Sequence, residues 1–397
     1  MQKDFHYYAT YCAARLAGYG HENGMEICYS AQLTDWCSRT FLGRLRAPKA
    51  AATTQLQLEL ADARTDLLSL QDITRIWASF HFLPYDLYAK VERSTRLYRN
   101  KYRLICKPNG ILVKDTLDLA KKMSEAGAAH GRGTQAVGLA MHVLVDTWAH
   151  SGFAGTPSLV INNTNTWFYE ILSGPDGETE RPVRFRHSTS APDDPEKGIY
   201  TNSIYQWDEN SIMNLGHGRA GHLPDYSFIR YRYLPAWGDY DEIVKDNPKE
   251  YWLAFCQMVY AMLFLRGKVP EFEPGHYAEE TVRPWAEEIH RILEKRQTDA
   301  CGDWKALGEK LAGQVLEDFD LEKYTGEYLG AKEDGKDVTF LGSFFLAAMA
   351  QKSMVTERIF RSGNLLAGFS VDFTQKGFHG IGDFRRLLKL FEKEGQG

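Results

Sequence analysis

Three side chains that could share a metal ion recur at four-residue intervals in AMHVLVDTWAH, residues 140–150: His142, Asp146 and His150. Four residues are slightly more than one turn of an α-helix, about 6 Å of rise, so these side chains share one helix face. Burying an unpaired carboxylate among apolar residues would cost several kcal/mol, so Asp146 requires a partner. Imidazole and carboxylate without thiolate suit Zn²⁺, Mn²⁺ or Fe²⁺ in an open, catalytic kind of site.

Other segments carry donors of the same type. They are His6 in KDFHYY, Asp35 in AQLTDWC, His81 in ASFHFLPYD, and His217, His222 and Asp225 in LGHGRAGHLPDYSF. Each has an ordinary alternative when taken alone. A single histidine among aromatic residues is often a hydrogen-bonded core residue, a single aspartate near a helix end is often a cap, and the Gly/Pro loop could be a surface turn.

Most of the elements that must position these donors are expected to be helical. Apolar residues recur with helical spacing over residues 5–17, 24–42, 115–129, 134–151, 248–267, 278–297, 303–318 and 340–361. Between about 155 and 240, Pro, Gly, Asp and Asn are frequent, which predicts long loops with at most a short hairpin. The expected fold is therefore mostly α, with one long irregular insertion of the kind that is commonly functional or lid-forming.

We expect a single domain over residues 1–397, with the loop or lid insertion at 155–240 and additional helices at 241–397. The formal net charge of −5 does not favour nucleic acid as a long, tightly held partner. The chain shows no signal-peptide pattern and no run of about 18 apolar residues, which predicts a cytoplasmic protein without a transmembrane segment. Its six scattered cysteines, with no CxxC pair, predict reduced and mostly buried thiols. The oligomeric state is not indicated.

Taken in chain order, the donors resemble the zinc-dependent phospholipase C and fungal single-strand nuclease superfamily. DFHYYATYCAARLAG and GHGRAGHLPD also resemble an uncharacterised bacterial family of this general type. The superfamily has a mostly helical bundle that holds three clustered metal ions. The resemblance implies that the metal ligands are His6, Asp35, His81, His142, Asp146, His150 and Asp225, with His217 or His222. It further implies that Asp146 bridges two metals and that Asp35 doubles as general base.

Two features depart from the superfamily pattern. His222 and Asp225 are three residues apart rather than four, so His217 competes for the same role. Secreted relatives also use the free amine of a processed N-terminal tryptophan, whereas this chain begins with MQKD. Either Asp4 substitutes for that amine, or one metal position is altered or absent. Sites with two and with three ions both remain open.

The function expected from these residues is hydrolysis of a phosphoester, a phosphodiester or phospholipid-like bond, by a metal-activated water. The expected cofactor is zinc, two or three ions, with iron or manganese as alternatives. The substrate would be a small molecule or other phosphoester, and Arg219 or the second loop histidine would be available to its phosphate. The alternatives are an iron oxygenase, an amide or lactone hydrolase, and a protein whose metals are purely structural.

Overall fold

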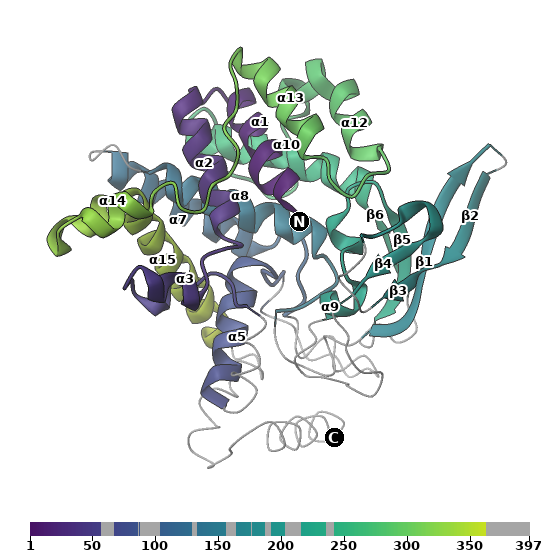
Figure 1. The fold of residues 1–397 in the computed structure, drawn as a ribbon, viewed down its shortest axis with the longest axis horizontal. Helices are drawn as coiled ribbons and strands as arrows, with labels where there is room; N and C mark the ends of the chain where they lie inside the picture. Colours follow the sequence, from purple (N-terminus) through teal and green to yellow (C-terminus); the bar gives the residue numbers. More distant parts are fainter. Residues whose placement is uncertain are drawn as a thin grey trace.

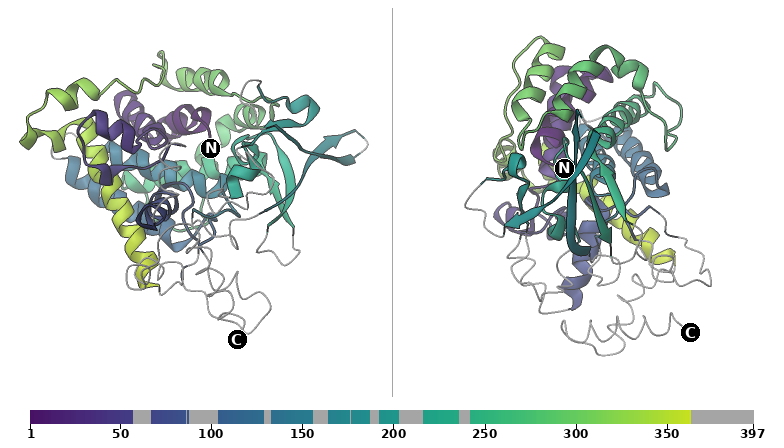
Figure 2. Two further views of the ribbon diagram at one scale, coloured as in Figure 1. Left: turned by 60° about the horizontal axis from the view of Figure 1, so that its bottom comes forward. Right: turned by 90° about the vertical axis from the view of Figure 1, so that its right-hand side faces the viewer.

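The computed structural model describes residues 1–56, 67–85, 87, 104–128, 133–155, 164–175, 177–186, 192–202, 216–235 and 242–362, and the statements below concern these residues. The helices form one body, and the strands lie along one side of it (Figure 1). Figure 2 shows the same arrangement from two further directions, with the N-terminus well inside the outline, between the helices and the sheet.

Helix α8 (Thr134–Ala149), which carries AMHVLVDTWA, lies at the centre of the helical body. Every residue after its first is buried. It packs against α2 (His21–Leu33), α7 (Ile111–Ala128), α10 (Asn247–Leu265) and α15 (Phe340–Arg361). A helix that is apolar on nearly all sides can be stable only when other elements cover it in this way.

The remaining helices surround this centre. They are a π-helical segment (Asp4–Ala9) that continues into α1 (Thr10–Leu16), then α3 (Arg39–Arg44), α5 (Leu67–Phe80), α9 (Gly216–Ala220), α11 (Glu279–Val282), α12 (Ala286–Glu294), α13 (Cys301–Ala312) and α14 (Thr325–Gly330), with short 3₁₀ turns between some of them.

The expectation of a mostly α fold, a helical bundle with a long irregular insertion, is wrong. The structure also contains a four-stranded antiparallel sheet, so the fold is mixed. Its strand order is β2 (Gly177–Pro182), β1 (Thr164–Gly174), β5 (Arg230–Pro235) and β6 (Ile243–Asp246). A short parallel pair, β3 (Arg184–Arg186) and β4 (Ile199–Thr201), lies beside it. Parts of the chain expected to be loops between 155 and 240 therefore form strands.

The sequence of β5, RYRYLP, shows why this region is β-structure. Its residues alternate between partly exposed and buried, as a strand with one face on a core requires. Tyr231 and Tyr233 are buried, whereas Arg232 donates to Glu180 at 2.9 and 2.8 Å on the other face. The high content of turn-forming residues around it obscured this period-two pattern.

Two hydrophobic cores meet near the C-terminal end of α8. The larger core lies within the helical body, and the smaller one includes Phe82, Phe153 and Phe168 and underlies the sheet. The two phenylalanines that flank His81 belong to different cores. Phe80 packs in the helical core and Phe82 in the sheet core, with His81 between them. The boundary between the cores is thus where polar donors are gathered.

Helix α2 is shorter than the spacing over 24–42 predicts. It ends at Leu33, and the hydroxyl of Thr34 donates to the carbonyl of Ser30 at 3.1 Å. Ser38 begins α3 by accepting a hydrogen bond from the amide of Phe41 at 3.1 Å. Asp35 therefore lies in the turn between two helices, where its side chain is 30% exposed, rather than within a helix.

All six cysteines lie in the described part of the chain and none is paired, which confirms the predicted reduced thiols; five are buried. None of the described helices combines the length and the apolar composition that crossing a membrane requires.

Gly138 allows α2 and α8 to approach closely, one helical turn before His142. A Cβ atom at this position would lie 2.6 Å from the Cβ of Ser30, and closer still to the carbonyl oxygen of Ile27. Real Cβ atoms do not approach a backbone oxygen so closely, so only glycine fits without moving a helix. The approach matters for the donors because it brings the carbonyl of Ala31 to the ring of His142.

We predict that Gly138→Ala lowers the free energy of unfolding by about 2 kcal/mol, since overpacking against backbone outweighs the better helix propensity of alanine. Urea unfolding followed by circular dichroism would measure it. Gly302→Ala in α13 is the matched control, because a Cβ there would meet open space. Equal stability of the two variants would contradict the close approach.

Candidate metal centre

The carboxylate of Asp146 lies at the centre of a buried group of nitrogen atoms and is only 1% exposed. Its Oδ1 is 2.9 Å from the α-amino nitrogen of Met1 and 3.2 Å from Nε2 of His6. Its Oδ2 is 3.2 Å from Nδ1 of His81 and 3.1 Å from Nε2 of His142. The structure thus brings together donors from segments that are as much as 145 residues apart.

Backbone carbonyls determine which nitrogen of two of these rings carries the proton. Nε2 of His81 lies 3.0 Å from the carbonyl oxygen of Thr53, and Nδ1 of His142 lies 2.9 Å from that of Ala31. A carbonyl oxygen can only accept, so each of these nitrogens must donate. In the neutral form of each ring, the opposite nitrogen, Nδ1 of His81 or Nε2 of His142, then carries a lone pair.

These two lone pairs and a carboxylate oxygen converge on one point. Nδ1 of His81 and Nε2 of His142 are 3.2 Å apart, and both face Oδ2 of Asp146. Three acceptors at these distances repel one another unless a cation lies among them. Ligands about 2.0–2.2 Å from a tetrahedral zinc ion are about 3.4 Å apart, so the spacing suits a shared ion.

A second group of donors lies where α8 meets the sheet core. Nδ1 of His150 donates to the carbonyl of His81 at 2.7 Å, which leaves its Nε2 to face Oδ1 of Asp225 at 3.3 Å. Nε2 of His217 lies 3.4 Å from the same oxygen. The ring of Phe82 stacks on that of His150 with 4.8 Å between centroids, which fixes the imidazole from its other side.

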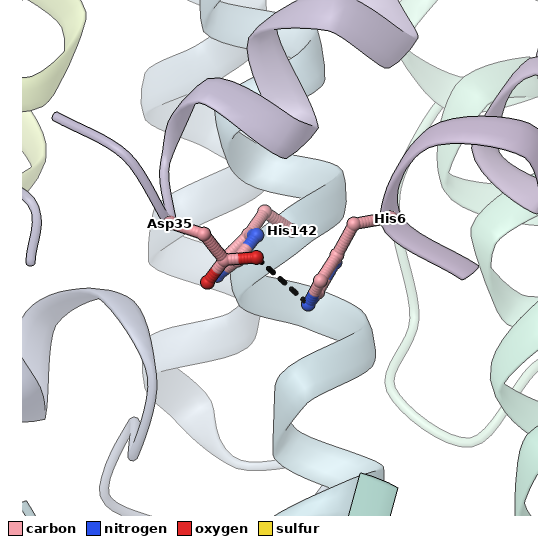
Figure 3. Close-up of side chains that lie close together, drawn as sticks. All are labelled: His6, Asp35 and His142. Atoms are coloured by element: carbon pink, nitrogen blue, oxygen red, sulfur yellow. Dashed lines mark ion pairs between the residues drawn. The ribbon is translucent and has the colours of Figure 1, made fainter. Parts of the chain in front are cut away.

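A third group consists of His6, Asp35 and His142, whose side chains point toward one another from three elements (Figure 3). The rings of His6 and His142 stack with 3.9 Å between centroids. Oδ2 of Asp35 is 4.0 Å from Nε2 of His6, and its Oδ1 is 3.9 Å from Nε2 of His142. Both ring nitrogens of His6 are buried and have no hydrogen-bond partner among the described residues.

The imidazoles of His6, His142 and His150 are neutral at physiological pH. Burial lowers the pKa of His6, His142 and His150 to about 4, and the neighbouring carboxylates only partly oppose this effect. Neutral imidazole is the form that binds metal ions.

The three carboxylates differ in their electrostatic environment. Burial would raise the pKa of Asp146 and of Asp225, but the neighbouring histidines and the Met1 amine hold both well below the usual range. For Asp35, burial is the largest effect and raises the pKa. Asp35 is therefore the carboxylate of this cluster that most readily accepts a proton.

The α-amino group of Met1 is part of the cluster. Its nitrogen lies 3.1 Å from Oδ1 of Asp225 in addition to its contact with Asp146. Burial opposes its charge, but the nearby carboxylates outweigh burial and raise its pKa to about 11. Asp4 instead accepts a hydrogen bond from the amide of Phe5 at 2.7 Å. The sequence left open that Asp4 substitutes or that one metal position is altered or absent; the structure instead places the Met1 amine, and not Asp4, beside Asp146.

The loop expected to carry the last ligands divides into inner and outer residues. His217 is 20% exposed and joins His150 and Asp225, whereas His222 is 53% exposed, with Nδ1 3.4 Å from Oδ2 of Asp225. Arg219 donates to the carbonyl of Thr164 at 2.8 Å, which holds its guanidinium against β1.

The geometry defines three adjoining groups of histidine and aspartate side chains that could hold metal ions. The chain belongs to DUF6765, a family of unknown function, whose sequence profile matches residues 1–359. No curated protein and no solved structure matches the chain.

The raised pKa of the Met1 amine predicts a pH dependence in metal-free protein. The stability that it contributes is fully present below pH 8 and is lost as the pH rises from 8 toward about 11. Asp146→Asn removes its nearest carboxylate, so the difference in unfolding free energy between wild type and variant should shrink over this range. Urea unfolding of both proteins in the presence of a chelator, at pH 8 and at about pH 10, measures this difference. Other groups that titrate at alkaline pH contribute equally to both proteins and cancel in the difference. A difference that is constant with pH would place the amine elsewhere.

Proposed function

We propose that this protein is a metal-dependent hydrolase that acts on a phosphoester. The observation that carries the proposal is the convergence of His81 Nδ1, His142 Nε2 and Asp146 Oδ2, which are three buried acceptors when both rings are neutral. Such an arrangement is unfavourable in a folded protein unless a cation is bound there.

The surroundings of Asp146 favour a cluster of ions over a single ion. Its two oxygens face different groups, Oδ1 toward the Met1 amine and His6, and Oδ2 toward His81 and His142. Asp146 could therefore hold two ions, one at each oxygen. With His150, His217 and Asp225 beyond it, the donors suffice for two or three ions, and their imidazole and carboxylate character suits zinc. When bound, clustered divalent ions lower the pKa of a water ligand and neutralise phosphoryl oxygens during its attack.

Asp35 has the properties of the proton acceptor in this reaction. Its side chain is 30% exposed, more than that of any other donor in the three groups, so water and substrate reach it. Its pKa is raised toward neutral pH, and a general base is most effective when its pKa is near the pH of the reaction. The side-chain amide of Gln32 donates to Oδ2 of Asp35 at 3.3 Å and so orients the carboxylate. The order of donors along the chain, which resembles zinc-dependent phospholipases C and nucleases, supports the same reaction.

We predict that protein purified with a carboxy-terminal tag, which leaves the Met1 amine free, contains two or three equivalents of zinc and hydrolyses bis(p-nitrophenyl) phosphate. Asp146→Asn should lose at least one equivalent and nearly all turnover. Asp35→Asn should lower kcat by about 100-fold or more through loss of the base. Elemental analysis beside the kinetic assay separates the effects. Iron in place of zinc would favour oxygen chemistry, and the absence of metal would remove the proposal.

We also predict that His217→Ala lowers metal content by up to one equivalent, whereas the matched variant His222→Ala, three residues from Asp225, retains full occupancy. The reason is the position of each ring, the first inside the donor group and the second mostly in solvent. Loss of metal only in His222→Ala would reverse the assignment of the two histidines.

A further inference from the structure

One aromatic side chain near the donors differs from its neighbours in exposure. Apart from Trp36, every aromatic residue within three positions of a donor, such as Phe5, Phe82 or Tyr226, is buried and at most 6% exposed. Trp36 is 51% exposed. Packing in the core explains the presence of the buried rings. It does not explain Trp36, whose indole leaves about half of a large apolar surface in water.

Trp36 follows Asp35 directly, so their Cα atoms are about 3.8 Å apart. Within the three groups of donors, Asp35 has the most exposed side chain. The turn between α2 and α3 thus presents an exposed indole and a partly exposed carboxylate at consecutive positions.

The backbone of Trp36 is held in place before any substrate arrives. Its amide donates to the carbonyl of Leu33 at 2.9 Å, and its own carbonyl accepts from the amide of Ser38 at 2.8 Å. The residue therefore belongs to the rigid turn that joins α2 to α3. A ring on a rigid support loses little freedom when a ligand stacks on it, which favours binding.

We propose that Trp36 selects phosphoesters that carry a planar aromatic group next to the phosphate. The proposal rests on the function proposed above for the adjoining donors. A flat ring needs one indole face for stacking, whereas a long acyl chain needs a row of exposed apolar side chains. Among the described aromatic residues that adjoin the donors, the exposed surface consists of this single ring, which favours an aromatic group over an acyl chain.

The test measures binding rather than turnover, so that it does not depend on catalysis. Calorimetry on the zinc-loaded protein would compare phenylphosphonate with methylphosphonate, which share the anionic head and differ in the ring. Wild type should bind phenylphosphonate about tenfold more tightly, equivalent to about 1.4 kcal/mol. Trp36→Ala should abolish the preference by weakening the phenyl compound alone, and Trp36→Phe should retain most of it.

The matched control is Trp167→Ala, which removes a similarly exposed indole from β1 and should leave both affinities unchanged. Three results would overturn the proposal: no phenyl preference in wild type, equal weakening of both ligands in Trp36→Ala, or a preference for octylphosphonate over phenylphosphonate. Failure of the proposed hydrolase function would appear separately, as a wild type that retains the phenyl preference but does not hydrolyse bis(p-nitrophenyl) phosphate.

Discussion

The fold is organised around one electrostatic constraint, the burial of the Asp146 carboxylate in the middle of the central helix. A buried negative charge is stable only when positive or donating groups surround it, and burial keeps the neighbouring imidazoles of His6 and His142 neutral. The Met1 ammonium supplies one positive charge at 2.9 Å. On the other oxygen, the nitrogens of His81 and His142 converge so that the three atoms could share a cation.

Backbone carbonyls from separate segments maintain this arrangement. Those of Ala31 and Thr53 fix the rings of His142 and His81, and the carbonyl of His81 fixes His150. His81 thus contributes its ring to one group of donors and its backbone to the orientation of another. Such outer contacts set the tautomer of each ring, as they do in well-studied metal proteins, and couple the groups mechanically.

The parts of the site that the sequence could predict are those encoded by short-range spacing. The four-residue step from His142 to His150 specifies one helix face and needs nothing from the rest of the chain. Asp35 could be named as a donor, but the end of α2 at Leu33 depends on the local hydrogen bonds of Thr34 and Ser38, which apolar spacing does not show. Exposure separates His217 from His222, and exposure arises only from tertiary packing.

The sheet is not predicted from the sequence for a related reason. The sequence RYRYLP does alternate, but β5 is short and its partner strands lie far along the chain. The turn-forming residues around β5 therefore favour the prediction of a loop. The position of the Met1 amine likewise depends on long-range packing of the first helical turn against α8.

The separation of the donors along the chain affects when the site can form during synthesis. Because the donors extend from Met1 to Asp225, a ribosome must complete more than half of the chain before the earliest residue meets its last partner. Any ion that these groups hold could meet the complete set of donors only after that point in synthesis.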